Sequence, residues 1–270
     1  MSWRFVRRSI VYVLLSIAAF VSVFPFYWMI VGATNKSALI VRGKADFGDN
    51  LFANAAAFFK LVDVPQVFWN STEISVIATI ATLAVSSTAG YGFEIFRSPI
   101  RERLFSFMLL LLTIPFAAIM VPLFSMVARA HLTNTFAAII LPTVASIFII
   151  FYFRQATKAF PGELRDAARV DGLKEWQIFL FIYVPVMRST YAAATIIVFL
   201  LNWNNYLWPL IVLQTNENKT VTLVVSTLLS AYVPDYGATL FATVLATLPT
   251  LIIFFALQRQ FVAGLTGGVK

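Results

Sequence analysis

The sequence predicts an all-α membrane protein with six transmembrane helices. The prediction depends on the composition, on recurring apolar stretches and on the distribution of basic residues. Of the 270 residues, 60% are hydrophobic and 12% are charged, whereas a soluble domain is typically about half apolar and about a quarter charged. The apolar stretches are about 20 residues long, so each can cross a hydrocarbon core of about 30 Å.

Hydropathy places the six predicted spans along the chain. The first follows Arg4, Arg7 and Arg8, as the core of a secretory signal would. It is longer than such a core, however, and no small-residue cleavage site ends it, so we interpret it as a retained span. The predicted spans lie near residues 10–31, 71–92, 104–127, 136–155, 187–211 and 238–258.

The basic residues predict the orientation of these spans. An even number of spans places both termini on one side, and that side then holds 14 of the 20 Lys and Arg residues. Short basic loops stay in the cytoplasm, so both termini and the loop after the fourth span are expected there. The net charge of +8 is therefore attributed to orientation, and we expect no binding of nucleic acid.

Two longer segments are expected on the outer side. Residues 32–70 carry apolar patches between charged residues and predict one or two short helices on the membrane surface. Residues 212–237 contain an apolar run too short to count as a further span, and they predict a short outward-facing helix or re-entrant piece. Prolines at 115, 122, 142, 209 and 249 lie within or beside spans and predict bends.

The predicted cytoplasmic loop of about residues 161–185 carries the most informative pattern. After Pro161 a short helix is expected, with Glu163 in its first turn, where a carboxylate suits the positive helix terminus. Leu164, Ala167 and Ala168 have the i, i+3, i+4 spacing that predicts one narrow face.

A glycine is predicted to end this helix. Gly172 suits that role because glycine readily adopts the left-handed conformation found at helix ends. The helix would therefore be short, with small residues on one side and charges around the rest. From composition alone, a solvated loop with an incidental helix remains an equal alternative.

The spacing in this loop matches a known pattern. Asp-Ala-Ala at 166–168 is followed after three residues by Gly172, and after nine more by Ile-Tyr-Val-Pro at 182–185. This resembles the EAA loop of permease subunits of binding-protein-dependent ABC importers, which reads EAA, three residues, Gly, nine residues, I-x-L-P. Two positions depart conservatively from it: Asp for Glu at 166, and Val for Leu at 184.

The resemblance extends beyond the loop, from about residue 70 to the end of the chain. The sequences AARVDG, WNNYLWPLIVL from Trp203 and the tail QRQFVAGLTGGVK are similar to the carbohydrate subgroup, and most similar to the second permease of maltose-type importers. This implies one permease domain over residues 1–270 with the type I importer permease fold. The core bundle would cover about 70–260, the first span would fit more loosely, and residues 258–270 would form a tail.

The resemblance also implies a mechanism. The loop helix would dock in a cleft of a cytoplasmic ATPase, with Asp166 and Arg169 as rim contacts, Ala167 and Ala168 as the docking face, and Gly172 as the bend. The tail from Gln258 to Lys270 would be a second ATPase contact. The candidate coupling residues are Glu163, Asp166, Ala167, Ala168, Arg169, Gly172 and Pro185.

The implied partners are a pair of ATPase subunits, which would hold ATP and Mg, a second homologous permease, an extracellular solute-binding protein and the lipid bilayer. The implied location is the bacterial cytoplasmic (inner) membrane, with several passes. The chain itself is expected to hold no cofactor and no catalytic site.

The fifth predicted span is interrupted by amides next to aromatic residues. Amides and aromatic faces suit sugars, which offer both hydroxyls and apolar ring faces, and polar groups within a span usually face protein or a water-filled cavity. An interfacial aromatic belt with helix–helix hydrogen bonds is the competing interpretation. The candidate substrate-path residues are Asn202, Trp203, Asn205 and Tyr206.

Other chemistries find little support. Cysteine is absent and His131 is the only histidine, so a thiolate or multi-histidine metal site is excluded. No phosphate-binding loop or reactive pair suggests an enzyme. A secondary transporter would carry buried ionisable groups, which these spans almost lack, and the charged loop of residues 94–103 is expected to be solvated.

The predicted function is therefore import of a sugar or oligosaccharide as the membrane subunit of an ATP-driven importer. Glycerol phosphate or another polyol-like solute is the first alternative, because importers of that class have very similar permeases. A secondary transporter is the second alternative.

Overall fold

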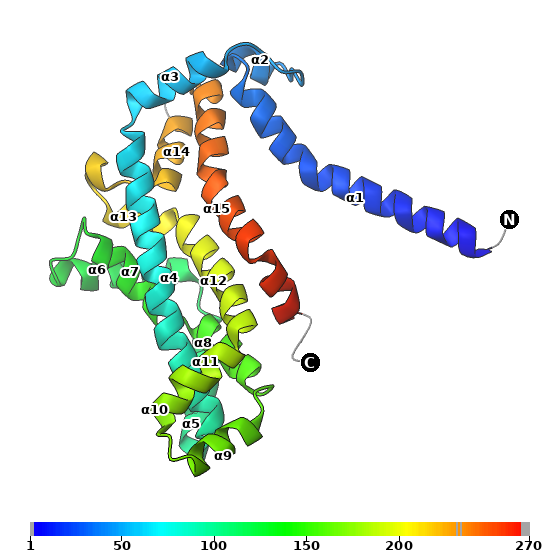
Figure 1. The fold of residues 1–270 in the computed structure, drawn as a ribbon. Helices are drawn as coiled ribbons and strands as arrows, with labels where there is room; N and C mark the ends of the chain where they lie inside the picture. Colours follow the sequence, from blue (N-terminus) through cyan, green and yellow to red (C-terminus); the bar gives the residue numbers. More distant parts are fainter. Residues whose placement is uncertain (1–2, 231, 233, 266–270) are drawn as a thin grey trace. The chain divides into compact units, whose positions relative to one another are not determined.

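The computed structural model describes residues 3–230, 232 and 234–265 of the chain, and every regular element among them is a helix (Figure 1). The elements are α1 (Trp3–Ala33), α2 (Ser37–Val41), α3 (Leu51–Leu61), α4 (Val64–Ile95), α5 (Pro99–Leu111), α6 (Phe116–Arg129), α7 (Phe136–Val144), α8 (Ile147–Thr157), α9 (Gly162–Val170), α10 (Glu175–Ile178), the π-helix η1 (Phe179–Tyr183), α11 (Val184–Val186), α12 (Arg188–Trp203), α13 (Leu207–Val212), the 3₁₀-helix η2 (Asn216–Asn218), α14 (Val221–Leu229) and α15 (Tyr236–Leu265).

Five helical segments of the described residues are long and apolar enough to cross a membrane. A bent pair, α5 with α6, gives up to six. The five segments are Arg7–Ala33, Val64–Ile95, Phe136–Thr157, Arg188–Val212 and Tyr236–Arg259. The all-α fold with several spans is therefore confirmed.

The third predicted span differs from the expectation. Residues 104–127 do not form one continuous helix, because α5 ends at Leu111, α6 begins at Phe116 and the two are bent by 102°. Pro115 precedes α6 with extended backbone angles (φ −64°, ψ 139°). Its ring disfavours the helical conformation at Ile114 and its nitrogen cannot donate a hydrogen bond, so the helix breaks there.

The described residues divide between two compact units. Unit 1 contains residues up to 64 and 224–248, and unit 2 contains residues 65–223 and those from 249 onward. Both segments expected on the outer side contain the short helices that were predicted, α2 and α3 within 32–70 and α14 within 212–237.

Unit 1 is held together by buried amides around the start of α15. The side chain of Asn54 donates hydrogen bonds to the carbonyl oxygens of Ala33 and Asn35, at 2.8 and 2.9 Å. Gly237 lies against this amide, since a Cβ there would approach the Asn54 side chain to 2.6 Å. The Ser37 hydroxyl donates to Asp235 at 2.9 Å. These contacts join the connection after α1 to α3 and to the beginning of α15.

Unit 2 is organised around α4. One side of this helix carries small hydroxyl residues, which are buried and let neighbouring helices approach closely. A close approach occurs at Gly90, where a Cβ would lie 2.6 Å from Cβ of Phe153 and 2.8 Å from the backbone nitrogen of Arg154. The end of α4 is therefore pressed against α8. The buried hydroxyl residues are Ser71, Ser75, Thr79, Thr82, Ser86 and Ser87.

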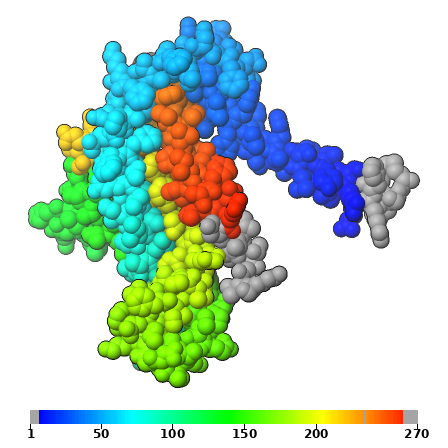
Figure 2. Space-filling view, in the orientation of Figure 1, coloured from blue at the N-terminus to red at the C-terminus, as the bar shows by residue number. Residues whose placement is uncertain are grey.

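Helices α5, α9, α10 and α11 gather at the end of α4 in Figure 1. In the space-filling view the yellow-green surface of about residues 160–190 covers this end of unit 2 (Figure 2). The predicted coupling loop is therefore a folded, surface-forming part of the unit.

Candidate coupling and substrate-path sites

The short helix predicted in the loop is present as α9, Gly162–Val170, with Glu163 in its first turn. Gly172 ends it as predicted, with φ at +84°. The Leu173 N–H donates to the Ala168 carbonyl and the Gly172 N–H donates to the Arg169 carbonyl, both at 3.0 Å. This pair of bonds is the Schellman arrangement, which closes a helix around a left-handed residue.

The faces of α9 differ from the prediction in one respect. Ala168 is only 4% exposed and packs inside the chain, whereas Leu164 and Ala167 are exposed. Of the two alanines in the predicted docking face, only Ala167 is exposed, because Ala168 contributes to the subunit's own packing; the docking itself stays a prediction. The outward face, which we call the α9 outer face, consists of Glu163, Asp166, Ala167 and Val170.

An ion-pair cluster holds α9 against α10. Oε1 of Glu175 lies 3.1 Å from Nη2 of Arg165 and 2.6 Å from Nη2 of Arg169. The side chain of Arg165 is only 16% exposed and that of Glu175 is 33% exposed. Burial raises the pKa of the Glu175 carboxyl, but the hydrogen bonds and charges of Arg165 and Arg169 outweigh it and hold the pKa below its ordinary value.

The sequence analysis placed Arg169 on the rim as a partner contact, and it did not identify Glu175. Arg169 remains 47% exposed, so it faces the rim while it also binds Glu175. Sequence offered only a weak signal for this pairing, since Glu175 lies beyond the glycine that ends α9. The turn at Gly172 brings it back to the helix.

Aromatic residues connect this cluster to α4. The Tyr91 ring packs on Phe179 and Tyr183, with ring centroids 5.3 and 4.8 Å apart, and its hydroxyl donates to Glu175 at 3.4 Å. The guanidinium of Arg165 lies over the Phe96 ring, 5.4 Å from its centroid. The α9–α10 segment is therefore attached to the end of α4 by packing as well as by charge.

The remaining loop position in the candidate set, Pro185, is exposed in α11. The π-helix η1 directly precedes it, and there the Val184 N–H donates to the Phe179 carbonyl. Such a wider turn is typically an isolated feature within an α-helix. Pro185 has no N–H to donate the i to i−4 hydrogen bond of an α-helix. It therefore lies where the chain changes from the π-helix η1 to the α-helix α11.

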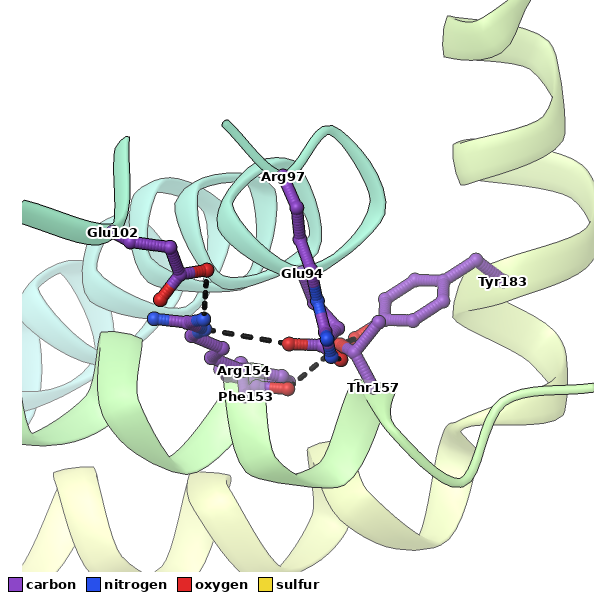
Figure 3. A network of polar contacts seen from close by, with 7 residues as sticks. All are labelled: Glu94, Arg97, Glu102, Phe153, Arg154, Thr157 and Tyr183. Atoms are coloured by element: carbon purple, nitrogen blue, oxygen red, sulfur yellow. Dashed lines mark hydrogen bonds and ion pairs between the residues drawn. The ribbon is translucent and has the colours of Figure 1, made fainter. Parts of the chain in front are cut away.

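A second ion-pair cluster has a buried pair, Glu94 and Arg154, at its centre and two exposed members, Arg97 and Glu102 (Figure 3). Nε of Arg154 lies 3.3 Å from Oε2 of Glu94, and its Nη2 lies 2.5 Å from Oε1 of Glu102. Arg97 also pairs with Glu94. The Arg154 guanidinium lies 4.0 Å from the centroid of the Phe105 ring. Three helices, α4, α5 and α8, are joined by these contacts.

This cluster corrects one expectation. The loop of residues 94–103 is not simply solvated, because the Glu94 side chain is 7% exposed. The fourth predicted span ends with a single buried charge, Arg154, whose side chain is 8% exposed. A signal was present in the sequence, since Arg154 lies inside the predicted fourth span, where an unpaired charge is unfavourable. The neighbouring bond between the hydroxyls of Thr157 and Tyr183, at 2.7 Å, connects α8 to η1 (Figure 3).

The predicted substrate-path residues divide into two pairs. Asn202 and Asn205 line a cavity of about 300 Å³ in unit 2. Trp203 does not line it; this side chain is 2% exposed and stacks on Phe199, with centroids 5.6 Å apart. Tyr206 is half-buried and packs against the hydrophobic core around Trp208. The two aromatic residues therefore pack within the chain, and a role of any of the four residues in the substrate path stays a prediction.

The predicted tail falls partly outside the described residues. Residues 258–265 belong to the end of α15, and residues 266–270 lie outside the described part. Among the described residues there is no group of three or more His, Asp or Glu side chains that could hold a metal ion.

Comparison with known proteins identifies the family. Residues 95–267 match the model of the binding-protein-dependent transport system inner membrane component. The chain is 66% identical over 259 residues to the lactose transport system permease protein LacG of Rhizobium radiobacter. The aligned region covers 96% of this chain and 95% of the LacG chain. It is 36% identical over 258 residues to the arabinooligosaccharides transport system permease protein AraQ of Halalkalibacterium halodurans, and this alignment covers 93% of this chain and 92% of the AraQ chain.

More distant relatives agree. The sn-glycerol-3-phosphate transport system permease protein UgpE of Agrobacterium fabrum is 28% identical over 273 residues, with 96% of each chain covered. A bacterial ABC transporter involved in the import of alginate has a chain with the same fold, at a TM-score of 0.82 and 18% identity, over 97% of this chain and 99% of that one. This chain belongs to the family of binding-protein-dependent transport system inner membrane components.

Proposed function

We propose that the chain is a permease subunit of an ATP-driven importer that moves a neutral sugar or oligosaccharide into the cell. The observation that carries the substrate class is the 66% identity to a lactose permease over almost the whole chain. The glycerol phosphate permeases, at 27–28% identity, are more distant, so glycerol phosphate remains the second candidate.

The same proposal assigns the roles of the partners. A pair of ATPase subunits would bind and hydrolyse ATP, an extracellular binding protein would deliver the sugar, and a second permease would complete the membrane path. This chain would have no catalytic site of its own. Residues 1–270 would act as one permease domain, which the family match supports because it includes residues of both compact units.

The α9 outer face is the proposed ATPase contact. It combines two carboxylates, Glu163 and Asp166, with the exposed apolar side chains of Ala167 and Val170, and Val170 is 88% exposed. An exposed apolar residue with charges around it is typical of the centre and rim of a protein interface. Ala168, Arg165 and Glu175 would support this face from behind rather than contact the partner.

Photo-crosslinking tests this function directly. A photoreactive amino acid at position 167 is expected to capture an ATPase subunit when the complete transporter is expressed in its own membrane. Position 130 is the matched control, because Ala130 is also exposed but lies after α6, away from the loop. Capture at 130 and not at 167, or no ATPase capture at 167, would contradict the proposed docking.

A further inference from the structure

Three helix breaks in unit 2 meet at the cavity that Asn202 and Asn205 line. The first separates α5 from α6, the second α7 from α8, and the third α12 from α13. Each break contributes to the lining: Phe116 is the first residue of α6, Ser146 precedes α8, and Asn205 lies between α12 and α13. The three interruptions come from successive spans and open onto one space.

Broken helices at membrane depth have a physical consequence. An interrupted helix leaves backbone groups without their usual partners, and this is tolerated where the backbone is buried in protein or lines a water-filled cavity. Discontinuous helices of this kind form substrate sites in several transporter folds. Here three discontinuous helices converge on one cavity. Pro115 accounts for only one of the three breaks.

The lining supplies hydrogen-bonding groups for a ligand. Asn202 donates one hydrogen bond, from Nδ2 to the Val198 carbonyl at 2.9 Å, and this fixes the direction of its amide. The Asn205 backbone is bonded to Asn202 and Thr222, but its side-chain amide makes no hydrogen bond within the described part of the chain. That amide can therefore both donate to and accept from a ligand hydroxyl.

Two aromatic rings complete the lining. Phe116 and Trp208 meet edge to face, with centroids 6.0 Å apart and an interplanar angle of 88°. Trp208 is held in place because its indole N–H donates to the Ala138 carbonyl at 2.9 Å. Phe116 is 41% exposed, so its ring provides flat apolar surface against which the C–H face of a sugar ring can pack, whereas Trp208 is buried and supports that ring from behind.

The charge and the size of the cavity restrict the ligand. All of the lining residues are uncharged, and a phosphate or carboxylate without a cationic partner is strongly disfavoured in such surroundings. A volume of about 300 Å³ is at the lower end of the range of about 300–1,000 Å³ found for small-molecule pockets. The space therefore suits one ring rather than a whole oligosaccharide.

We propose that this cavity is a subsite of the translocation path that holds one uncharged sugar ring, with Asn202 and Asn205 binding its hydroxyls and Phe116, supported by Trp208, lying against its apolar face. The assignment rests on the proposed function as a sugar importer. It adds that this subunit contacts the transported molecule itself, and that anionic solutes are excluded by the neutral lining.

The test uses the complete transporter in proteoliposomes, with its binding protein saturated with labelled lactose. Asn205→Leu is compared with Asn204→Leu, which changes the adjacent exposed amide that does not line the cavity. The loss of one to two hydrogen bonds is expected to lower lactose uptake about fivefold to tenfold in Asn205→Leu. ATP hydrolysis stimulated by the binding protein should stay within about twofold in both variants.

The outcomes separate the subsite from the function. Equal uptake by the two variants would overturn the subsite, and so would a parallel fall of uptake and ATP hydrolysis in Asn205→Leu, because that would assign the residue to packing. If the wild-type transporter imports neither lactose nor an arabinooligosaccharide, the proposed function fails as well. Uptake of sn-glycerol 3-phosphate by the wild type would overturn the proposal that the ligand is uncharged.

Discussion

Arg154 shows how a single charged side chain is accommodated at the end of a span. Its guanidinium contacts carboxylates from two other helices and the ring of Phe105. Burial of a charge is unfavourable unless it is paired and hydrogen-bonded, and here several partners share that role. The arginine therefore joins α8 to α4 and α5, next to the helices that form the candidate coupling site.

Arg154→Met is expected to lower the stability of the subunit strongly. Removal of one partner leaves Glu94 buried with an incomplete set of contacts, and breaking a buried pair typically lowers the free energy of unfolding by about 3–5 kcal/mol. Arg97→Met is the matched control, because it also removes a partner of Glu94 but its side chain is 58% exposed, and an exposed pair contributes about 0–1 kcal/mol. Thermal unfolding of the detergent-purified complex measures both, and equal midpoints for the two variants would contradict this account.

Helix α9 illustrates how an element acquires an outer and an inner side. Its i, i+3, i+4 spacing predicts a stripe but does not indicate which part of the stripe the chain covers. The pairing of Glu175 with Arg165 and Arg169 turns one side inward and buries Ala168. The side that remains for a partner is consequently the one centred on Ala167.

Gly172→Ala is expected to weaken ATPase association, because an L-residue at φ +84° is strained by roughly 1–2 kcal/mol. Gly162→Ala is the matched control, since the added methyl meets no atom within 4 Å at either position and Gly162 does not have a positive φ. A loss of about 1 kcal/mol corresponds to about fivefold weaker association. The amount of ATPase that co-purifies with each variant measures this association. Equal amounts from both variants would exclude a role for the Gly172 turn in ATPase association.

At the scale of the whole molecule, orientation follows from the basic residues and can be tested through the absence of cysteine. The chain contains no Cys, so an introduced one reports a single position. The basic loops predict that α9 faces the cytoplasm and α3 the outer side. Both helices offer an exposed alanine for the purpose, at positions 167 and 56.

A membrane-impermeant maleimide is therefore expected to label Ala56→Cys in intact cells. Ala167→Cys should react only after the membrane is opened, because its side chain would lie in the cytoplasm. Detection of both variants with an antibody, independently of the maleimide, shows that each protein is present in equal amount. Reaction of Ala167→Cys in intact cells would reverse the orientation and remove the basis of ATPase docking.

The sequence by itself determined the class of fold, the approximate spans and the position of α9, since these depend on local hydropathy, spacing and the conformational freedom of Gly172. It also determined the family, through the loop pattern and the similarity that runs over most of the chain. Residues such as Asn202 and Asn205 were found because an amide inside an apolar stretch stands out without any knowledge of its neighbours.

Only the tertiary structure decided which residues meet. Arg154 pairs with Glu94 across 60 positions of sequence, Ala168 is covered rather than free, and three separate breaks open onto one cavity. Such contacts depend on how helices cross, and the crossing of α4 with α8 at Gly90 is a matter of shape that no local pattern contains. Burial and pairing are properties of two segments together, and a linear sequence describes only one segment at a time.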